Sequence, residues 1–131
     1  MNNNNIIENV FKRKDEIIKR TKEYQQSDVS DYAVIRRNMY EYFDKNYNND
    51  EIMVIQSIMY FGRECYSGFG DNYDGNVYKV INDWMKNLFF SFGKDINKEI
   101  EIDQMIGKQS KIGTYFEYGF KELENRGVYR I

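Results

Sequence analysis

Apolar residues recur at steps of three and four along most of this chain, and this spacing constrains the fold more than any other feature of the sequence. Such steps place side chains on one face of an α-helix. The pattern is clearest after Asn76, at Val77, Val80, Ile81, Trp84, Met85, Leu88, Phe89 and Phe92. It predicts a packed helix there, with Trp84 in the core and its indole N–H bonded to a carbonyl group.

The same spacing predicts further helices at 6–24, 32–43, 51–66 and 112–123. The helix at 51–66 is apolar nearly all round, which predicts a central position, and Asn49 suits its N-terminal cap. Gly93 and Gly127 suit the ends of two other helices. The segment 96–107 is open to two interpretations, since it suits a helix capped by Asp95 but also alternates like a short strand.

The sequence therefore predicts a mostly α, compact bundle of about five or six helices in a single domain, 1–131. Its 131 residues are 41% hydrophobic and 17% aromatic, which suits one folded core. The asparagine-rich start, 1–5, is expected to be disordered, and the tail at 128–131 to be loose. One loop, 67–76, is rich in Gly, Asp and Asn, the residues that favour turns.

The residue types that the sequence lacks limit the catalytic and metal-binding chemistry of the chain. The chain has no histidine, and Cys65 is its one cysteine, so histidine-dependent catalysis and multi-cysteine metal sites are excluded within it. A net charge of −2 gives no overall positive field to hold a polyanion, which disfavours a dedicated nucleic-acid binder. We expect no cofactor, no metal and no catalytic residue, and so not an enzyme.

Location and origin follow from the same composition. No apolar run approaches the roughly 20 residues that span a bilayer, so no membrane association is expected and the protein should be cytoplasmic. The bias toward Asn, Ile, Lys and Tyr, with no proline, is typical of an AT-rich bacterial or phage genome. A phage-encoded protein would act in the host cytoplasm.

The loop at 67–76 allows functional interpretations beside that of a solvated connection. Gly68 and Gly70 before a helix start are reminiscent of phosphate-binding loops, although no strand precedes them and no Gly-Lys-Ser/Thr follows. Its acidic and amide side chains also suggest a hard cation. However, aligning Gly75 with the invariant glycine of an EF-hand puts Gly70 at the first ligand and Ile81 at the last. A solvated loop is the favoured interpretation.

Arg63 and Glu64 end an apolar helix beside this loop, where charged groups are partly desolvated. Arg63 either contributes to a polar site or forms an intramolecular ion pair with Asp83 or another carboxylate. Cys65 is expected to be a small buried residue, because no histidine is present to activate it. The candidate ligand-binding or partner-binding residues are Arg63, Glu64, Phe69, Asp71, Tyr73 and Asp74.

Two segments resemble a bacterial helical family called domain of unknown function 3775. They are Asn49-Asp50-Glu51 through Ile58-Met59-Tyr60-Phe61-Gly62-Arg63, and Ile112-Gly113-Thr114-Tyr115-Phe116-Glu117-Tyr118-Gly119-Phe120. The first is similar to an Asp-Glu helix that ends in Gly-Arg, and the second to a terminal helix with Tyr and Gly-Leu, with Phe120 in place of the leucine. The resemblance implies a compact helical domain in which Arg63 is of interest, and it implies no activity.

Twelve tyrosines are too many for a core of this size, so many should face solvent, and exposed tyrosine is enriched at interfaces. The leading hypothesis is a non-catalytic binding protein of phage or mobile-element origin that inhibits a bacterial defence protein by occupying its surface. The alternative is a small-ligand or nucleotide-binding domain that uses residues 63–75. A homodimer formed through an aromatic face is compatible with both.

Overall fold

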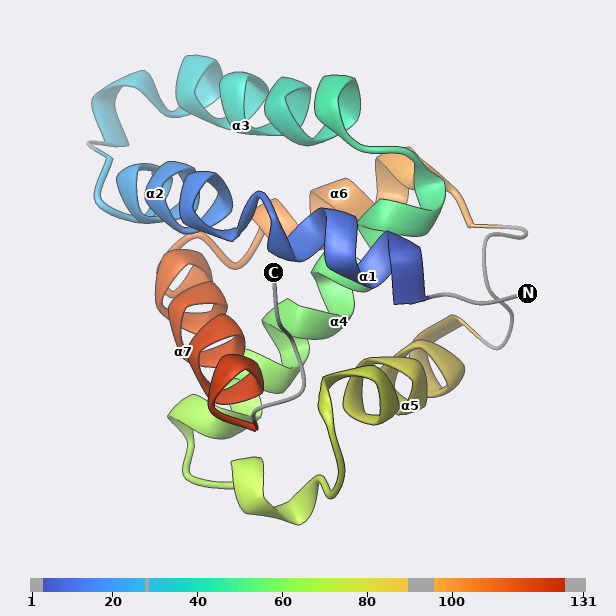
Figure 1. The fold of residues 1–131 in the computed structure, drawn as a ribbon. Helices are drawn as coiled ribbons and strands as arrows, with labels where there is room; N and C mark the ends of the chain where they lie inside the picture. Colours follow the sequence, from blue (N-terminus) through green and yellow to red (C-terminus); the bar gives the residue numbers. More distant parts are fainter. Residues whose placement is uncertain (1–3, 28, 90–95, 127–131) are drawn as a thin grey trace.

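The computed structural model of the chain describes residues 4–27, 29–89 and 96–126. Within these ranges it holds seven α-helices, two 3-10 helices and no strand (Figure 1). The helices are α1 (Asn4–Phe11), α2 (Lys14–Gln25), η1 (Val29–Asp31), α3 (Tyr32–Asn46), α4 (Asn49–Tyr66), η2 (Gly70–Asn72), α5 (Val77–Phe89), α6 (Lys98–Ile106) and α7 (Ile112–Asn125). The mostly α fold is confirmed, and the predicted count of five or six helices is too low.

The count differs because the helix predicted at 6–24 is two helices, α1 and α2. The N–H of Arg13 bonds to the carbonyl of Val10, a tighter turn than the α-helix makes. The break falls in a polar run between Phe11 and Ile17, both of which are fully buried or nearly so. Dividing the helix there lets each half turn its own apolar face to the core.

Helix α4 is the central helix, as predicted, and contacts α1, α5, α6 and α7 (Figure 1). Every residue from Ile52 to Met59 is buried. Its cap lies one residue earlier than predicted, since Asn48 accepts a hydrogen bond from the Glu51 N–H at 2.9 Å and the Glu51 carboxylate accepts one from the Asn48 N–H at 2.9 Å. This reciprocal pair is a capping box, which fixes the start of the helix.

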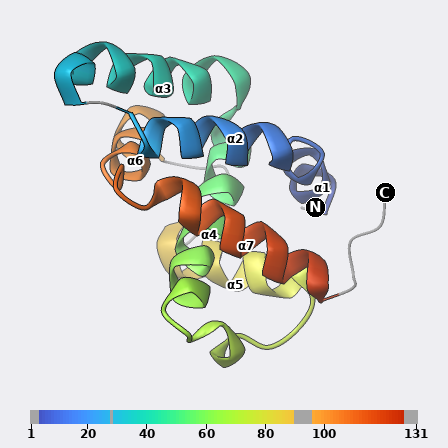
Figure 2. The ribbon, with the colours of Figure 1, turned by 90° about the vertical axis from the view of Figure 1, so that its left-hand side faces the viewer.

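Helix α7 crosses α4 at unusually close range, and glycine makes this possible. A Cβ atom on Gly62 would lie 1.7 Å from the carbonyl oxygen of Tyr115, and one on Gly119 would lie 2.6 Å from that of Ile58. On the next side of α7, a Cβ on Gly113 would lie 2.6 Å from Cα of Lys22 in α2, and Figure 2 shows α2 and α7 side by side. At these glycines the backbone of α7 therefore packs directly against the backbones of α4 and α2, whereas most packed helices are separated by side chains.

The remaining predictions have mixed outcomes. The segment 98–106 is a helix and not a strand, and its cap is Asn97, which accepts a hydrogen bond from the Ile100 N–H at 3.2 Å. Asn4 and Asn5 belong to α1, so the disorder predicted for 1–5 is wrong for these two residues. The positions proposed at Phe92, Gly93, Asp95, Gly127 and 128–131, and residues 1–3, lie outside the described residues.

Helix α3 lies at one end of the bundle, where its main helix contacts are with α2 and α6 (Figures 1 and 2). It is anchored by Tyr42, which is 6% exposed and whose hydroxyl is within hydrogen-bond distance of the Tyr47 hydroxyl and of the Glu16 carboxylate, at 2.8 Å and 2.9 Å. Burial, followed by the hydrogen bond with Tyr47, raises the pKa of Tyr42.

None of the described helices has both the length and the apolar character that crossing a membrane requires.

Candidate functional site

Three of the six predicted site residues come together at the C-terminal end of α4. The Arg63 guanidinium lies 4.8 Å from the centre of the Tyr60 ring and 3.9 Å from a carboxylate oxygen of Glu64. The Tyr73 hydroxyl donates a hydrogen bond to the other oxygen of Glu64, at 3.2 Å. The predicted intramolecular ion pair of Arg63 is therefore present with Glu64, while Asp83 pairs with Lys79 at 2.8 Å.

The Tyr73 ring belongs to an aromatic stack. It stacks on Trp84 with centroids 5.3 Å apart, and Trp84 in turn stacks on Tyr60 at 6.2 Å. Trp84 is only half-buried, contrary to the core position predicted for it. Its Nε1 is buried and has no hydrogen-bond partner in the described part of the chain, so the predicted bond to a carbonyl is not found there.

Phe69, Asp71 and Asp74 do not join this group. All three are exposed, and Phe69 is 53% exposed beyond the end of α4. Asp74 and Tyr73 line a polar hollow of about 480 Å³ together with Asn72, Lys79, Asp83, Lys86 and Asn87. The predicted set is thus divided between the end of α4 and the side of the loop that faces α5.

The loop owes its shape to Arg126, which the sequence interpretation missed. The Arg126 guanidinium donates hydrogen bonds to the carbonyl groups of Tyr73, Gly75 at 3.0 Å and Gly70 at 3.2 Å, and it also contacts the Glu122 carboxylate at 3.2 Å. One side chain from the end of α7 therefore holds three backbone carbonyls of the loop.

The phosphate-loop interpretation finds little support in this geometry. At the start of α5, the N–H of Lys79 is already bonded to the Asn76 side chain at 3.0 Å, which uses one of the donors an anion would need. No group of three or more potential metal-binding side chains occurs in the ranges that the structure describes.

Cys65 is half-buried beside this loop, and burial raises its pKa to about 11, with the Glu122 carboxylate adding to the effect. A thiol with this pKa is a poor nucleophile at neutral pH. We expect iodoacetamide to alkylate Cys65 in the folded protein at pH 8 at least about tenfold more slowly than in the unfolded chain, because the smaller thiolate fraction outweighs the higher nucleophilicity of a more basic thiolate. Mass spectrometry with and without denaturant measures this, and equal rates would contradict it.

A cluster of exposed tyrosines lies on the outer side of the α4–α7 crossing. The Tyr66 ring meets Tyr118 edge-on with centroids 5.4 Å apart and Tyr115 at 6.0 Å. Tyr66 and Tyr118 are 42% and 44% exposed, and Tyr115 is half-buried. We call Tyr66, Tyr115 and Tyr118 the tyrosine face. The sequence indicates surplus tyrosine, but it does not show that two distant helices bring these three together.

Lysine ties the tyrosine face to the connection before α7. The Lys111 ammonium donates a hydrogen bond to the Tyr66 hydroxyl at 3.0 Å and lies 4.9 Å from the centre of the same ring. This hydrogen bond raises the pKa of Lys111, which therefore stays protonated at neutral pH. The tyrosine rings are thus held by each other and by a cation, which limits their freedom before any partner arrives.

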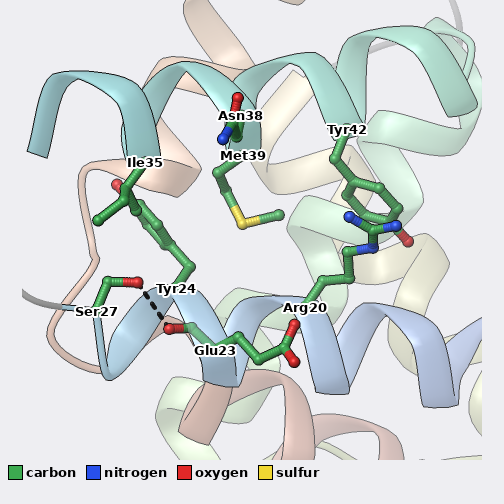
Figure 3. Close-up of a pocket in the computed structure, with 8 residues that line it drawn as sticks. All are labelled: Arg20, Glu23, Tyr24, Ser27, Ile35, Asn38, Met39 and Tyr42. Carbon is green, nitrogen blue, oxygen red and sulfur yellow. Dashed lines mark hydrogen bonds between the residues drawn. The ribbon is translucent and has the colours of Figure 1, made fainter. Parts of the chain in front are cut away.

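A second hollow, of about 230 Å³, lies between α2 and α3 and was not predicted (Figure 3). It is lined by Arg20, Glu23, Tyr24, Ser27, Ile35, Asn38, Met39 and Tyr42. Figure 3 shows Met39 reaching from α3 into the gap, with Arg20 and Glu23 on the α2 side. The Arg20 guanidinium lies 4.9 Å from the centre of the Tyr42 ring.

Three hydroxyl groups of this hollow, those of Tyr24, Ser27 and Tyr42, already have partners inside the protein. The Tyr24 hydroxyl donates to the Ile106 carbonyl at 2.8 Å, and the Ser27 hydroxyl donates to the Glu23 carbonyl at 2.8 Å. Its volume is also below the roughly 300–1,000 Å³ of typical ligand pockets. The hollow has room for a few waters or one side chain, and a nucleotide would not fit in it.

The fold and its surface define an all-helical domain, in the described ranges, that presents exposed aromatic side chains. The chain matches no protein-family model, no curated protein and no solved structure at a significant level. The resemblance to the domain of unknown function 3775 family therefore stays a prediction.

Proposed function

We propose that this chain is a non-catalytic protein-binding domain that acts by occupying a surface of a bacterial protein. The observation that carries this proposal is the tyrosine face, where Tyr66 and Tyr118 are exposed and in mutual contact. Tyrosine is enriched in binding hot spots because its rigid ring buries much area while its hydroxyl remains able to hydrogen-bond.

The rigidity of the supporting helices favours the same conclusion. Tyr66 lies at the end of α4, and Tyr115 and Tyr118 lie on α7, which crosses α4 at the Gly62 and Gly119 contacts. Because the backbones touch there, the positions from which the three rings project are fixed relative to each other. A surface already held in its binding geometry loses less conformational entropy on association.

The narrower proposal is that the bound protein is a bacterial defence protein, that binding inhibits it, and that a phage or mobile element encodes the chain. Its support is the small size of the chain, its AT-rich composition and its lack of histidine. Expressing the chain in bacteria that carry a defence system should restore phage plating, and no change in plating across several systems would contradict this narrower proposal.

Affinity capture from bacterial lysate tests the protein-binding proposal when it compares matched variants. The double variant Tyr66→Ala/Tyr118→Ala should lose a stoichiometric partner that the wild type retains after nuclease treatment. Tyr32→Ala on α3 is the control, since Tyr32 is 43% exposed and lies on a different helix. Loss of the partner with Tyr32→Ala alone would place the interface elsewhere and overturn the assignment. A homodimer would appear instead as a concentration-dependent mass in sedimentation.

The alternative function, small-ligand binding by residues 63–75, is favoured by one observation, the polar hollow beside Tyr73 and Asp74. The Lys79 and Lys86 side chains on its α5 side could meet an anionic ligand. Thermal shift measurements with nucleotides test it, and stabilisation should disappear in Lys79→Ala and Lys86→Ala. An absence of stabilisation by any nucleotide counts against this alternative.

A further inference from the structure

Positive side chains surround the tyrosine face. Lys111 bonds to Tyr66, and Lys121 lines a shallow hollow of about 290 Å³ with Tyr118 and Glu117. One turn earlier on α4, Arg63 lies over the Tyr60 ring, and the Lys108 ammonium lies 5.6 Å from the centre of the same ring. Two lysines therefore lie at the tyrosine face itself, and Arg63 and Lys108 lie at Tyr60, which is about two turns before Tyr66 on α4.

The carboxylates near this surface are already engaged within the protein. Glu117 pairs with Lys22 at 2.8 Å, and Glu122 pairs with Arg126 at 3.2 Å. Glu64 accepts the Tyr73 hydroxyl and also meets Arg63.

The lysines, by contrast, keep their charge available. Among the residues that the structure describes, no carboxylate lies within 4.0 Å of the ammonium groups of Lys108, Lys111 or Lys121. This surface is therefore locally positive although the chain carries a net charge of −2.

We propose that the tyrosine face binds an acidic segment of a partner protein, in which Asp or Glu residues flank an apolar or aromatic side chain. This inference rests on the proposed protein-binding function and adds the chemistry of the partner. The apolar side chain packs against Tyr66 and Tyr118, and the flanking carboxylates meet Arg63, Lys108, Lys111 and Lys121. Complementary charge of this kind accelerates association and fixes the register of the segment.

The ring geometry favours a protein segment over single-stranded nucleic acid, which also combines with cations and aromatic rings. Base stacking requires an open ring face. Here Lys111 lies over the Tyr66 ring, and Tyr60 stacks on Trp84 while Arg63 and Lys108 lie near the same ring. The rings of Tyr66 and Tyr60 therefore each have a face already covered by a cation or an aromatic ring, which leaves less open ring for base stacking.

Fluorescence anisotropy with labelled probes tests the inference. The probes are a synthetic peptide in which Glu alternates with Leu and Phe, the same peptide with Lys in place of Glu, polyglutamate, and single-stranded oligothymidylate. We expect the acidic apolar peptide to bind best. Raising the salt from about 0.1 M to about 1 M, which shortens the Debye length from about 10 Å to about 3 Å, should weaken binding.

Charge reversal gives the sharper result. Lys108→Glu/Lys111→Glu/Lys121→Glu should weaken binding of the acidic peptide at least about tenfold and make the Lys peptide the better ligand. The control Lys12→Glu/Lys19→Glu/Lys45→Glu makes the same change in net charge at exposed lysines elsewhere on the molecule and should leave the preference unchanged. Circular dichroism establishes that both variants fold, and replacement of the three lysines by Gln provides a milder second test.

The outcomes separate this inference from the proposed function. If Tyr66→Ala/Tyr118→Ala loses a captured protein but the charge-reversal variant retains it, the tyrosine face binds a protein, and the inference that the bound segment is acidic is wrong. If the acidic peptide fails to bind the wild type, or binds the control variant more weakly than the charge-reversal variant, the inference is overturned. Tightest binding of the oligothymidylate would assign the face to nucleic acid instead.

Discussion

Replacing Gly62 by Ala is expected to destabilise the protein by about 3 kcal/mol, near the upper end of the usual cost of overpacking a core. The added Cβ would lie 1.7 Å from the carbonyl oxygen and 2.6 Å from the carbonyl carbon of Tyr115, and both are backbone atoms. Alanine stabilises a helix relative to glycine by roughly 0.5–1 kcal/mol, which is too small to compensate. Thermal unfolding should show a fall in Tm of roughly 10 °C.

Gly107→Ala is the matched control for this substitution. Gly107 is an exposed glycine with φ of −64° at the end of α6. A Cβ atom added there would lie 3.2 Å from the Asp103 carbonyl oxygen, its nearest neighbour. Its Tm should change by only a few degrees in either direction. If Gly62→Ala were as stable as this control, the close crossing of α4 and α7 would be wrong.

The Gly62→Ala substitution connects the fold to the proposed function. Tyr115, whose backbone opposes Gly62, is a member of the tyrosine face, and Tyr66 and Tyr118 lie on the two helices that the added methyl group would separate. We therefore infer that Gly62, Gly113 and Gly119 serve the architecture of the proposed binding surface. Partner affinity should fall together with stability in Gly62→Ala.

The sequence predicted the fold correctly where apolar residues recur within a single helix. The central position of α4 follows from its being apolar nearly all round, and the helix around Val80 and Met85 follows from local periodicity. The break between α1 and α2 leaves a weaker trace, since the positions one turn after Phe11 hold Lys14 and Asp15 and not apolar residues. The one-residue error at the α4 cap arose because Asn48 and Asn49 are equally good capping residues.

The candidate site was harder to predict because it depends on contacts between distant segments. Arg63 and Glu64 are sequence neighbours and could be singled out at the end of an apolar helix, but the tyrosine face needs α4 and α7 to cross first. Arg126 binds backbone carbonyls, and any residue type can supply a carbonyl. Such an interaction leaves no periodicity and no composition bias by which a sequence could reveal it.

Replacing Arg126 by Met should loosen the loop 67–76 and cost about 1.5–3 kcal/mol, the range for hydrogen bonds to a charged group. Methionine preserves an apolar contact with the Phe61 ring, whose centre lies 5.4 Å from the guanidinium carbon, but it removes the donors to Gly70, Tyr73 and Gly75. Hydrogen exchange should show faster exchange at the amides of Asn72 and Tyr73, which bond within the loop, well before the amides of α4 exchange.

Two further variants separate the role of the planar donor group from that of charge. Arg126→Lys keeps the charge but cannot present several N–H groups in one plane, so it should protect the loop amides only partly. Arg37→Met, at an exposed arginine of α3, should leave both stability and loop exchange unchanged. If Arg126→Lys protected the loop fully, charge alone would suffice. If Arg126→Met left loop exchange unchanged, the loop would be held by its own turns, and the side chain at the end of α7 would have no part in positioning Phe69, Asp71 and Asp74.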